Sequence, residues 1–128
     1  MILLDTSVLI DYFRTSDRRL LALMQQHAAA ICGVTRAEVL HGALGAQHRQ
    51  RLLTTLNTFG QVLIPDALWD SIGDNLAVLR SRGVTVPFAD VVIATVALAA
   101  DVELWARDGH FADVQRIIPA LRLFQEPP

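Results

Sequence analysis

The sequence contains no lysine, and all eleven of its basic residues are arginine, so chemistry that requires a lysine is excluded. It has a single cysteine, Cys32, which rules out an intramolecular disulfide and a multi-cysteine zinc site. The most apolar stretch, Val91 to Ala100, has about half of the roughly 20 residues that a membrane span needs. The N-terminus shows neither a basic segment nor a cleavage site for secretion, so a cytoplasmic protein is expected.

An excess of positive charge is also lacking, because thirteen acids against eleven bases give a formal net charge of −2. The total therefore gives no sign of a nucleic-acid partner. The sequence is instead rich in apolar residues. Of its 128 residues, 52% are hydrophobic and 19% are charged, which excludes a disordered chain. The length fits a single domain, residues 1–128, with one substantial core.

Short apolar strands alternate with helices along the whole chain. This alternation predicts an α/β fold, a three-layer sandwich around a central, mostly parallel sheet of about five strands. An apolar stripe of Leu20, Leu21, Leu23 and Met24 fits either core packing or a surface for a partner or a second copy. Asp17, Thr35 and Asp66 are expected to cap helices. The predicted strands are Ile2–Leu4, Ala30–Val34, Gln61–Ile64, Val102–Ala106 and Leu121–Phe124, and the predicted helices are Val8–Phe13, Arg18–Ala29, Arg36–Gly45, Gln47–Phe59, Ala67–Arg82, Phe88–Ala100 and Phe111–Ile117.

Four carboxylates lie where the ligand crevice of such a fold is expected, at the carboxyl ends of the strands. Asp5 directly follows the first strand, Glu38 lies one turn into the helix after the second, and Asp108 follows the fourth strand. Asp90 is the most unusual of the four, because it interrupts an apolar helix, where a buried carboxylate is costly unless it is paired or bound to a metal. The alternative interpretation is an ordinary first-turn acid that is favoured by the helix dipole. Four carboxylates together would repel one another, and a hard divalent cation such as Mg²⁺ or Mn²⁺ relieves that repulsion.

Several other polar residues have ordinary structural interpretations. Asp11 is expected to be structural or solvent-facing, and His41 to lie on a helix surface or at a pocket edge. His110 can border the site because it follows Asp108. Trp69 and Trp105 are expected to pack rather than to stack on bases.

Four segments in order resemble the PIN-domain ribonucleases, specifically the VapC-type toxins of bacterial toxin–antitoxin modules. They are Leu4–Asp11, Thr35–Ala43, Pro87–Ala94 and Arg107–Phe111. The resemblance covers nearly the whole chain and assigns the acidic metal site to Asp5, Glu38, Asp90 and Asp108, with Thr6 or Ser7 orienting the carboxylates.

The same resemblance implies a Mg²⁺- or Mn²⁺-dependent endoribonuclease that leaves 5′-phosphate and 3′-hydroxyl ends. It also implies a homodimer and an antitoxin partner whose C-terminal tail occupies the acidic groove. The chain departs from the family at Ala106, where a polar residue is usual, so the site around Asp108 is expected to be looser.

Other functions fit the sequence less well. A phosphotransfer receiver domain needs a lysine, a haloacid-dehalogenase-like phosphatase needs a second Asp where Ser7 stands, and a P-loop NTPase needs a glycine-rich motif that is missing. A PIN-like module without catalysis, which would bind protein or RNA only, stays open as the alternative.

Overall fold

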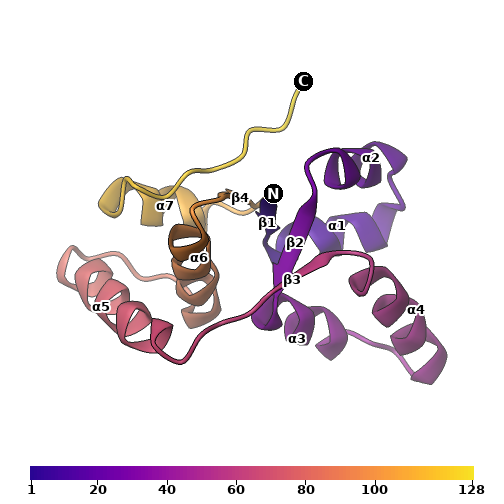
Figure 1. Ribbon diagram of the computed structural model, residues 1–128, viewed down its shortest axis with the longest axis horizontal. Helices are drawn as coiled ribbons and strands as arrows, with labels where there is room; N and C mark the ends of the chain where they lie inside the picture. The colour runs from indigo at the N-terminus through magenta and orange to yellow at the C-terminus, as the bar shows by residue number, and fades with distance from the viewer.

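A parallel four-stranded sheet forms the centre of the molecule, as the computed structural model of all 128 residues shows (Figure 1). The strand order is β3-β2-β1-β4, and every neighbouring pair is parallel. The N-terminal strand therefore lies inside the sheet, where its residues pair with two neighbours. The strands are β1 (Ile2–Leu4), β2 (Ala29–Cys32), β3 (Gly60–Val62) and β4 (Glu103–Trp105).

Helices cover both faces of this sheet, so the predicted three-layer α/β sandwich is confirmed. Helices α1 to α4 lie on one face and α5 to α7 on the other (Figure 1). All three residues of β1 are buried, because a sheet covered on both faces has no solvent side. The helices are α1 (Thr6–Thr15), α2 (Arg18–Gln26), α3 (Gly33–His41), α4 (Ala46–Leu56), α5 (Leu68–Ser81), α6 (Phe88–Ala100) and α7 (His110–Ile117).

The core is divided by the sheet into two clusters, and the alternation of strand side chains decides which residue joins which. Ile2 and Leu4 pack with the α1–α4 layer, whereas Leu3 packs with the α5–α7 layer. Leu20, Leu23 and Met24 of α2 are buried in the first cluster, so core packing accounts for most of the stripe that the sequence left open.

The predicted fifth strand, Leu121–Phe124, is reduced to a single parallel bridge between Leu104 and Leu123. Two hydrogen bonds hold it, from Leu104 N–H to Arg122 O and from Phe124 N–H to Leu104 O, both at 2.8 Å. The segment therefore contributes one bridge beside β4 and not a fifth strand.

Two of the three predicted helix caps are wrong. Asp17 does cap α2, since its side chain accepts from Arg19 N–H, but α3 begins at Gly33 and α5 at Leu68 without a side-chain cap. Thr35 is fully buried inside α3, where its hydroxyl donates to Leu4 O at 3.2 Å. That bond ties α3 to the end of β1, which is a tertiary role that a local capping pattern cannot reveal.

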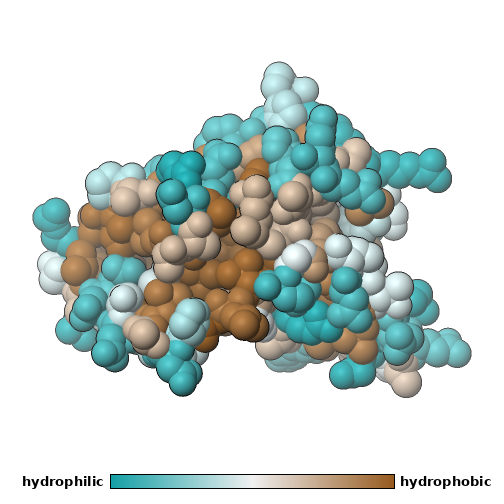
Figure 2. Space-filling view, viewed as in Figure 1, coloured by the Kyte–Doolittle hydropathy of each residue, from teal (hydrophilic) through white to brown (hydrophobic).

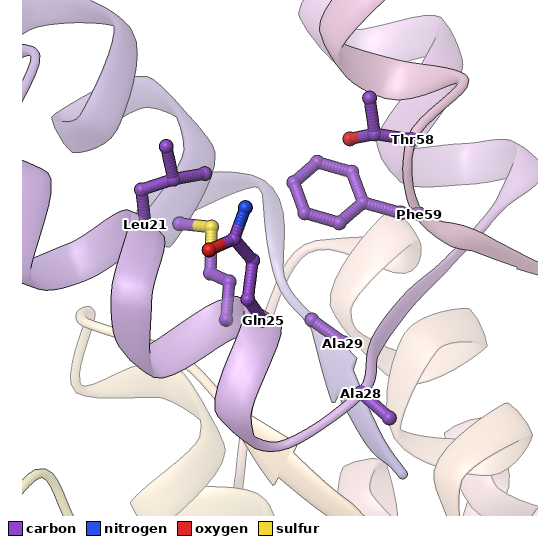
Figure 3. Close-up of a pocket in the computed structure, with 7 residues that line it drawn as sticks. Leu21, Gln25, Ala28, Ala29, Thr58 and Phe59 are labelled. Carbon is purple, nitrogen blue, oxygen red and sulfur yellow. The ribbon is translucent and has the colours of Figure 1, made fainter.

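A cavity of about 260 Å³ lies at the amino ends of β2 and β3 (Figure 3). Leu21 and Gln25 of α2 face Phe59 across it, with Ala28 and Ala29 beside them. No carboxylate lines it, and it lies at the opposite edge of the parallel sheet from the predicted acids. It is therefore not the expected chemical site.

Exposed apolar side chains gather on the half of the molecule built by α5 and α6, which Figure 2 shows as a hydrophobic area over these helices. The large hydrophobic residues exposed in this half are Leu63, Trp69, Val78 and Phe88. None of the helices has the length and apolar character required to cross a membrane.

Candidate metal centre

Asp5 is fixed where β1 passes into α1. It is the N-cap of α1, and its Oδ2 accepts hydrogen bonds from Ser7 N–H at 3.0 Å and Ser7 Oγ at 2.6 Å. Only 3% of the residue is exposed. Burial raises the pKa of Asp5 above its usual range against the lowering effect of the Ser7 hydrogen bonds, and the charge of Asp108 raises it further. Asp5 is thus a rigid carboxylate whose negative charge is not fully compensated.

Asp90 lies in the first turn of α6 and is buried among apolar neighbours. Its Oδ2 is 2.7 Å from His110 Nδ1. Burial raises the pKa of Asp90 to about 6; the His110 contact lowers it, and the charges of Asp5 and Asp108 raise it again. A favourable interaction with the helix dipole does not by itself account for the position of Asp90, because Asp5 and Asp108 lie close enough to raise its pKa.

Asp108 lies in the turn between β4 and α7, with about a third of its side chain exposed. Its Oδ1 accepts from His110 N–H at 3.0 Å. Asp90, Asp108 and His110 each offer one ligand atom, and these atoms all lie within 4.8 Å of one another. Contact with Asp90 raises the pKa of the His110 imidazole.

Glu38 sits on an exposed turn of α3 and approaches the other acids from the side. Its Oε1 accepts a hydrogen bond of 2.6 Å from Thr6 Oγ1, next to Asp5 in the chain. Thr6 therefore orients Glu38, while Ser7 orients Asp5. The structure brings Asp5, Asp90 and Asp108 into mutual electrostatic contact and places Glu38 at their margin.

The turn that carries Asp108 is held by its neighbour in the chain. Arg107 N–H donates to Ser7 Oγ at 2.9 Å, and the Arg107 side chain reaches Asp11 and Glu126 rather than the acidic site. Asp11 is thus structural, as predicted.

Three contributors to the site were missed or only partly seen in the sequence. The sequence predicts His110 at the border of the site and not as a possible ligand, although its position two residues after Asp108, at the start of a helix, is a usable signal. The contact between Arg107 and Glu126 has no signature in the sequence, because the fold of the C-terminal segment alone brings these two residues together.

The chemistry of the donors fits a hard divalent cation. Three carboxylates converge, two of them with raised pKa values, and no arginine forms an ion pair with Asp5, Glu38, Asp90 or Asp108. Carboxylate oxygens are the ligands that Mg²⁺ and Mn²⁺ prefer. Burial is the main cause of these raised pKa values, and such an ion would offset the mutual repulsion that adds to it.

Comparison with known proteins agrees with this geometry. The PIN domain family profile matches residues 2–117. A curated relative, Ribonuclease VapC1 of Methanocaldococcus jannaschii, is 33% identical over 111 residues, which cover 86% of this chain and 78% of the relative.

Solved structures share the fold over nearly the whole chain. VapBC2 of Rickettsia felis bound to a DNA fragment of its promoter aligns with a TM-score of 0.84 and 20% identity, covering 97% of this chain and 98% of that one. FitAcB of Neisseria gonorrhoeae aligns with a TM-score of 0.77 and 19% identity, over 98% and 97% of the two chains. Fold, acidic site and sequence relationship agree: the chain belongs to the PIN-domain family.

Proposed function

We propose that this protein is a divalent-metal-dependent endoribonuclease, the toxin of a toxin–antitoxin pair, which hydrolyses RNA to 5′-phosphate and 3′-hydroxyl ends. The observation that carries the proposal is the convergence of Asp5, Asp90 and Asp108 at the carboxyl edge of the sheet, without an arginine to neutralise them. The relative named as a ribonuclease supports RNA as the substrate.

Asp5, Asp90, Asp108 and Glu38 would hold Mg²⁺ or Mn²⁺. When bound, such an ion polarises phosphoryl oxygens and lowers the pKa of water, which supplies the nucleophile. The protein's own contribution is orientation: Ser7 fixes the Asp5 carboxylate, Thr6 fixes that of Glu38, and His110 holds Asp90. Outer hydrogen bonds of this kind reduce the freedom of the ligands before the metal arrives.

A partner antitoxin belongs to the same proposal, supported by structural relatives described as a toxin–antitoxin complex and as a member of a family of toxin–antitoxin systems. An arginine from a partner's tail could pair with the carboxylates in a bidentate manner and exclude the metal. A homodimer and a cytoplasmic location are further parts of the proposal. The exposed apolar residues of the α5–α6 half support a surface for self-association.

The test is cleavage of RNA by the purified protein with Mn²⁺ or Mg²⁺, followed by mapping of the fragment ends. Asp5→Asn and Asp90→Asn are expected to lose on the order of 100-fold or more of the activity, because loss of a ligand should exceed the 10- to 100-fold effect of an outer partner. Asp74→Asn, which alters an exposed acid on α5, is the matched control and should cleave like the wild type.

Equal cleavage by the wild type and both site variants would contradict the assignment of the site. No cleavage by the wild type with either metal would leave the non-catalytic binding module as the better interpretation. Fragments that end in a 2′,3′-cyclic phosphate would contradict the mechanism, since they require the ribose hydroxyl to be the nucleophile.

A further inference from the structure

The C-terminal segment is anchored to the end of β4 by one acidic side chain. Glu126 accepts three hydrogen bonds: from Arg107 Nε at 2.9 Å, from Arg107 Nη2 at 2.7 Å and from Trp105 Nε1 at 3.0 Å. Paired contacts between a guanidinium and a carboxylate are among the strongest and most directional in proteins. The Trp105 ring is completely buried, so its N–H needs this acceptor.

Further contacts hold the same segment in place. The Leu104–Leu123 bridge pairs it with β4, and the Phe124 ring packs on Trp105 with centroids 4.9 Å apart. Arg19 donates to Pro127 O. The segment therefore approaches Arg107 along a defined path rather than as a free end.

Arg107 links this segment to the acidic site. Its Nη1 lies 3.1 Å from Asp11 of α1, and its backbone N–H donates to Ser7, which in turn holds Asp5. Arg107 also directly precedes Asp108. About 30% of each side chain of the Arg107–Glu126 pair is exposed, so the pair is partly shielded from water. The Arg107 contact lowers the pKa of Glu126 below its usual range.

We propose that Glu126 is a positioning residue for the metal centre, acting through Arg107 to fix the turn that carries Asp108. The side chain of Ala106 offers no hydrogen bond, so this turn depends on Arg107 for its attachment. Without Glu126, the Arg107 side chain keeps only its Asp11 contact, and the turn is held to Ser7 by the Arg107 backbone N–H alone. Asp108 then loses its fixed orientation towards Asp5 and Asp90. The inference rests on the proposed metal-dependent function.

The experiment compares the affinity for Mn²⁺, measured by titration calorimetry without RNA, in the wild type, Glu126→Gln, Arg107→Gln and the double variant. Glu126→Gln keeps an oxygen for the Trp105 N–H and removes the charge. We expect Mn²⁺ binding about 3- to 10-fold weaker in each single variant, less than for a residue that touches a ligand directly. The double variant should bind no more weakly than the weaker single variant, because both changes break one pathway.

Asp101→Asn is the matched control, because Arg122 and Asp101 form another ion pair between the C-terminal segment and the body of the protein, 3.0 Å long and away from the acids. It should bind Mn²⁺ within twofold of the wild type. Thermal unfolding of each variant separates positioning from general stability: a purely structural role for Glu126 would lower Tm and leave the Mn²⁺ affinity unchanged, which would overturn the inference.

Asp90→Asn distinguishes the failure of this inference from the failure of the proposed function. If Asp90→Asn loses Mn²⁺ binding while Glu126→Gln binds as the wild type does, only the positioning role is wrong. If the wild type itself binds no Mn²⁺, both are wrong. Should Glu126→Gln not fold, wild-type affinity in Arg107→Gln would by itself contradict the pathway.

Discussion

The acidic residues of the site are held in surroundings that favour their protonated form. Asp5 and Asp90 are both buried, and neither has a permanent cationic partner. Side chains that only stabilised the fold would not be arranged so, because each raised pKa represents free energy lost when the group ionises. The metal-free protein should therefore be less stable at neutral pH than its core would allow.

Asp90→Asn is expected to stabilise the metal-free protein above about pH 7. The pKa of Asp90 is raised from 3.8 to about 6, so between these values the folded chain binds more protons than the unfolded chain. The free energy of unfolding consequently falls as pH rises through this window, on the order of 2–3 kcal/mol in all at about 1.4 kcal/mol per pKa unit. Urea unfolding of both proteins with EDTA at pH 4 to 8 measures the effect.

The stability difference between the two proteins should shrink as the pH falls from 7 towards 4, because Asp90 becomes protonated in the folded wild-type chain across this range. Added Mn²⁺ should stabilise the wild type and leave Asp90→Asn unchanged. A difference that stays constant from pH 4 to pH 8 would contradict the raised pKa.

At the scale of elements, α6 is the helix on which the α5–α7 layer is built. Its residues from Asp90 to Ala97 are all buried, so this part of the helix has no solvent face. Thr95 lies in this run, and its hydroxyl both donates to Val91 O at 2.7 Å and accepts from Asn75 Nδ2 of α5 at 3.0 Å. One side chain thus joins α5 to α6, the helix that carries Asp90.

Thr95→Val should lower the free energy of unfolding by about 1–2 kcal/mol, because it leaves the Asn75 amide without its partner in a half-buried position. Chemical denaturation measures the loss. Thr54→Val is the matched control, since Thr54 makes the same bond to the carbonyl four residues earlier, Gln50 O, on the exposed surface of α4. The control should change stability by less than about 0.5 kcal/mol, and an equal loss in both variants would show that the link to α5 contributes nothing.

At the scale of the whole molecule, β1 joins the two halves of the core. Leu3 and Leu4 are both fully buried, but they belong to the clusters on opposite faces of the sheet. Neither layer can lose its contact with β1 without disturbing the pairing of β1 with β2 and β4. The protein should consequently unfold as one cooperative unit.

Leu3→Ala and Leu4→Ala are each expected to cost about 2–5 kcal/mol, the usual range for a large core residue. Each variant should retain a single unfolding transition by circular dichroism and by tryptophan fluorescence. Leu63→Ala, which alters a side chain that is 83% exposed, should change stability little. Two separate transitions in either core variant would mean that the layers fold independently.

The sequence was a good guide wherever local pattern and burial coincide. The run from Phe88 to Ala100 predicted α6 with its observed bounds, and its one charged residue pointed to the site. The acids at the ends of β1 and β4 could be placed because parallel topology brings carboxyl ends to one edge. What could not be predicted depends on tertiary contacts: the burial of Thr35 under Leu4 O, and the fixing of Arg107 by Glu126, nineteen residues later in the chain.

The placement of the two tryptophans gives the protein an internal optical reporter. Trp105 is completely buried with a carboxylate on its indole N–H, whereas Trp69 is 45% exposed on α5, and indole emission responds to such differences in polarity and hydrogen bonding. The fluorescence of Trp105 should therefore change when Glu126 leaves the indole N–H. With Trp69 replaced by phenylalanine, the remaining signal would follow the docking of the C-terminal segment in real time, without an added label.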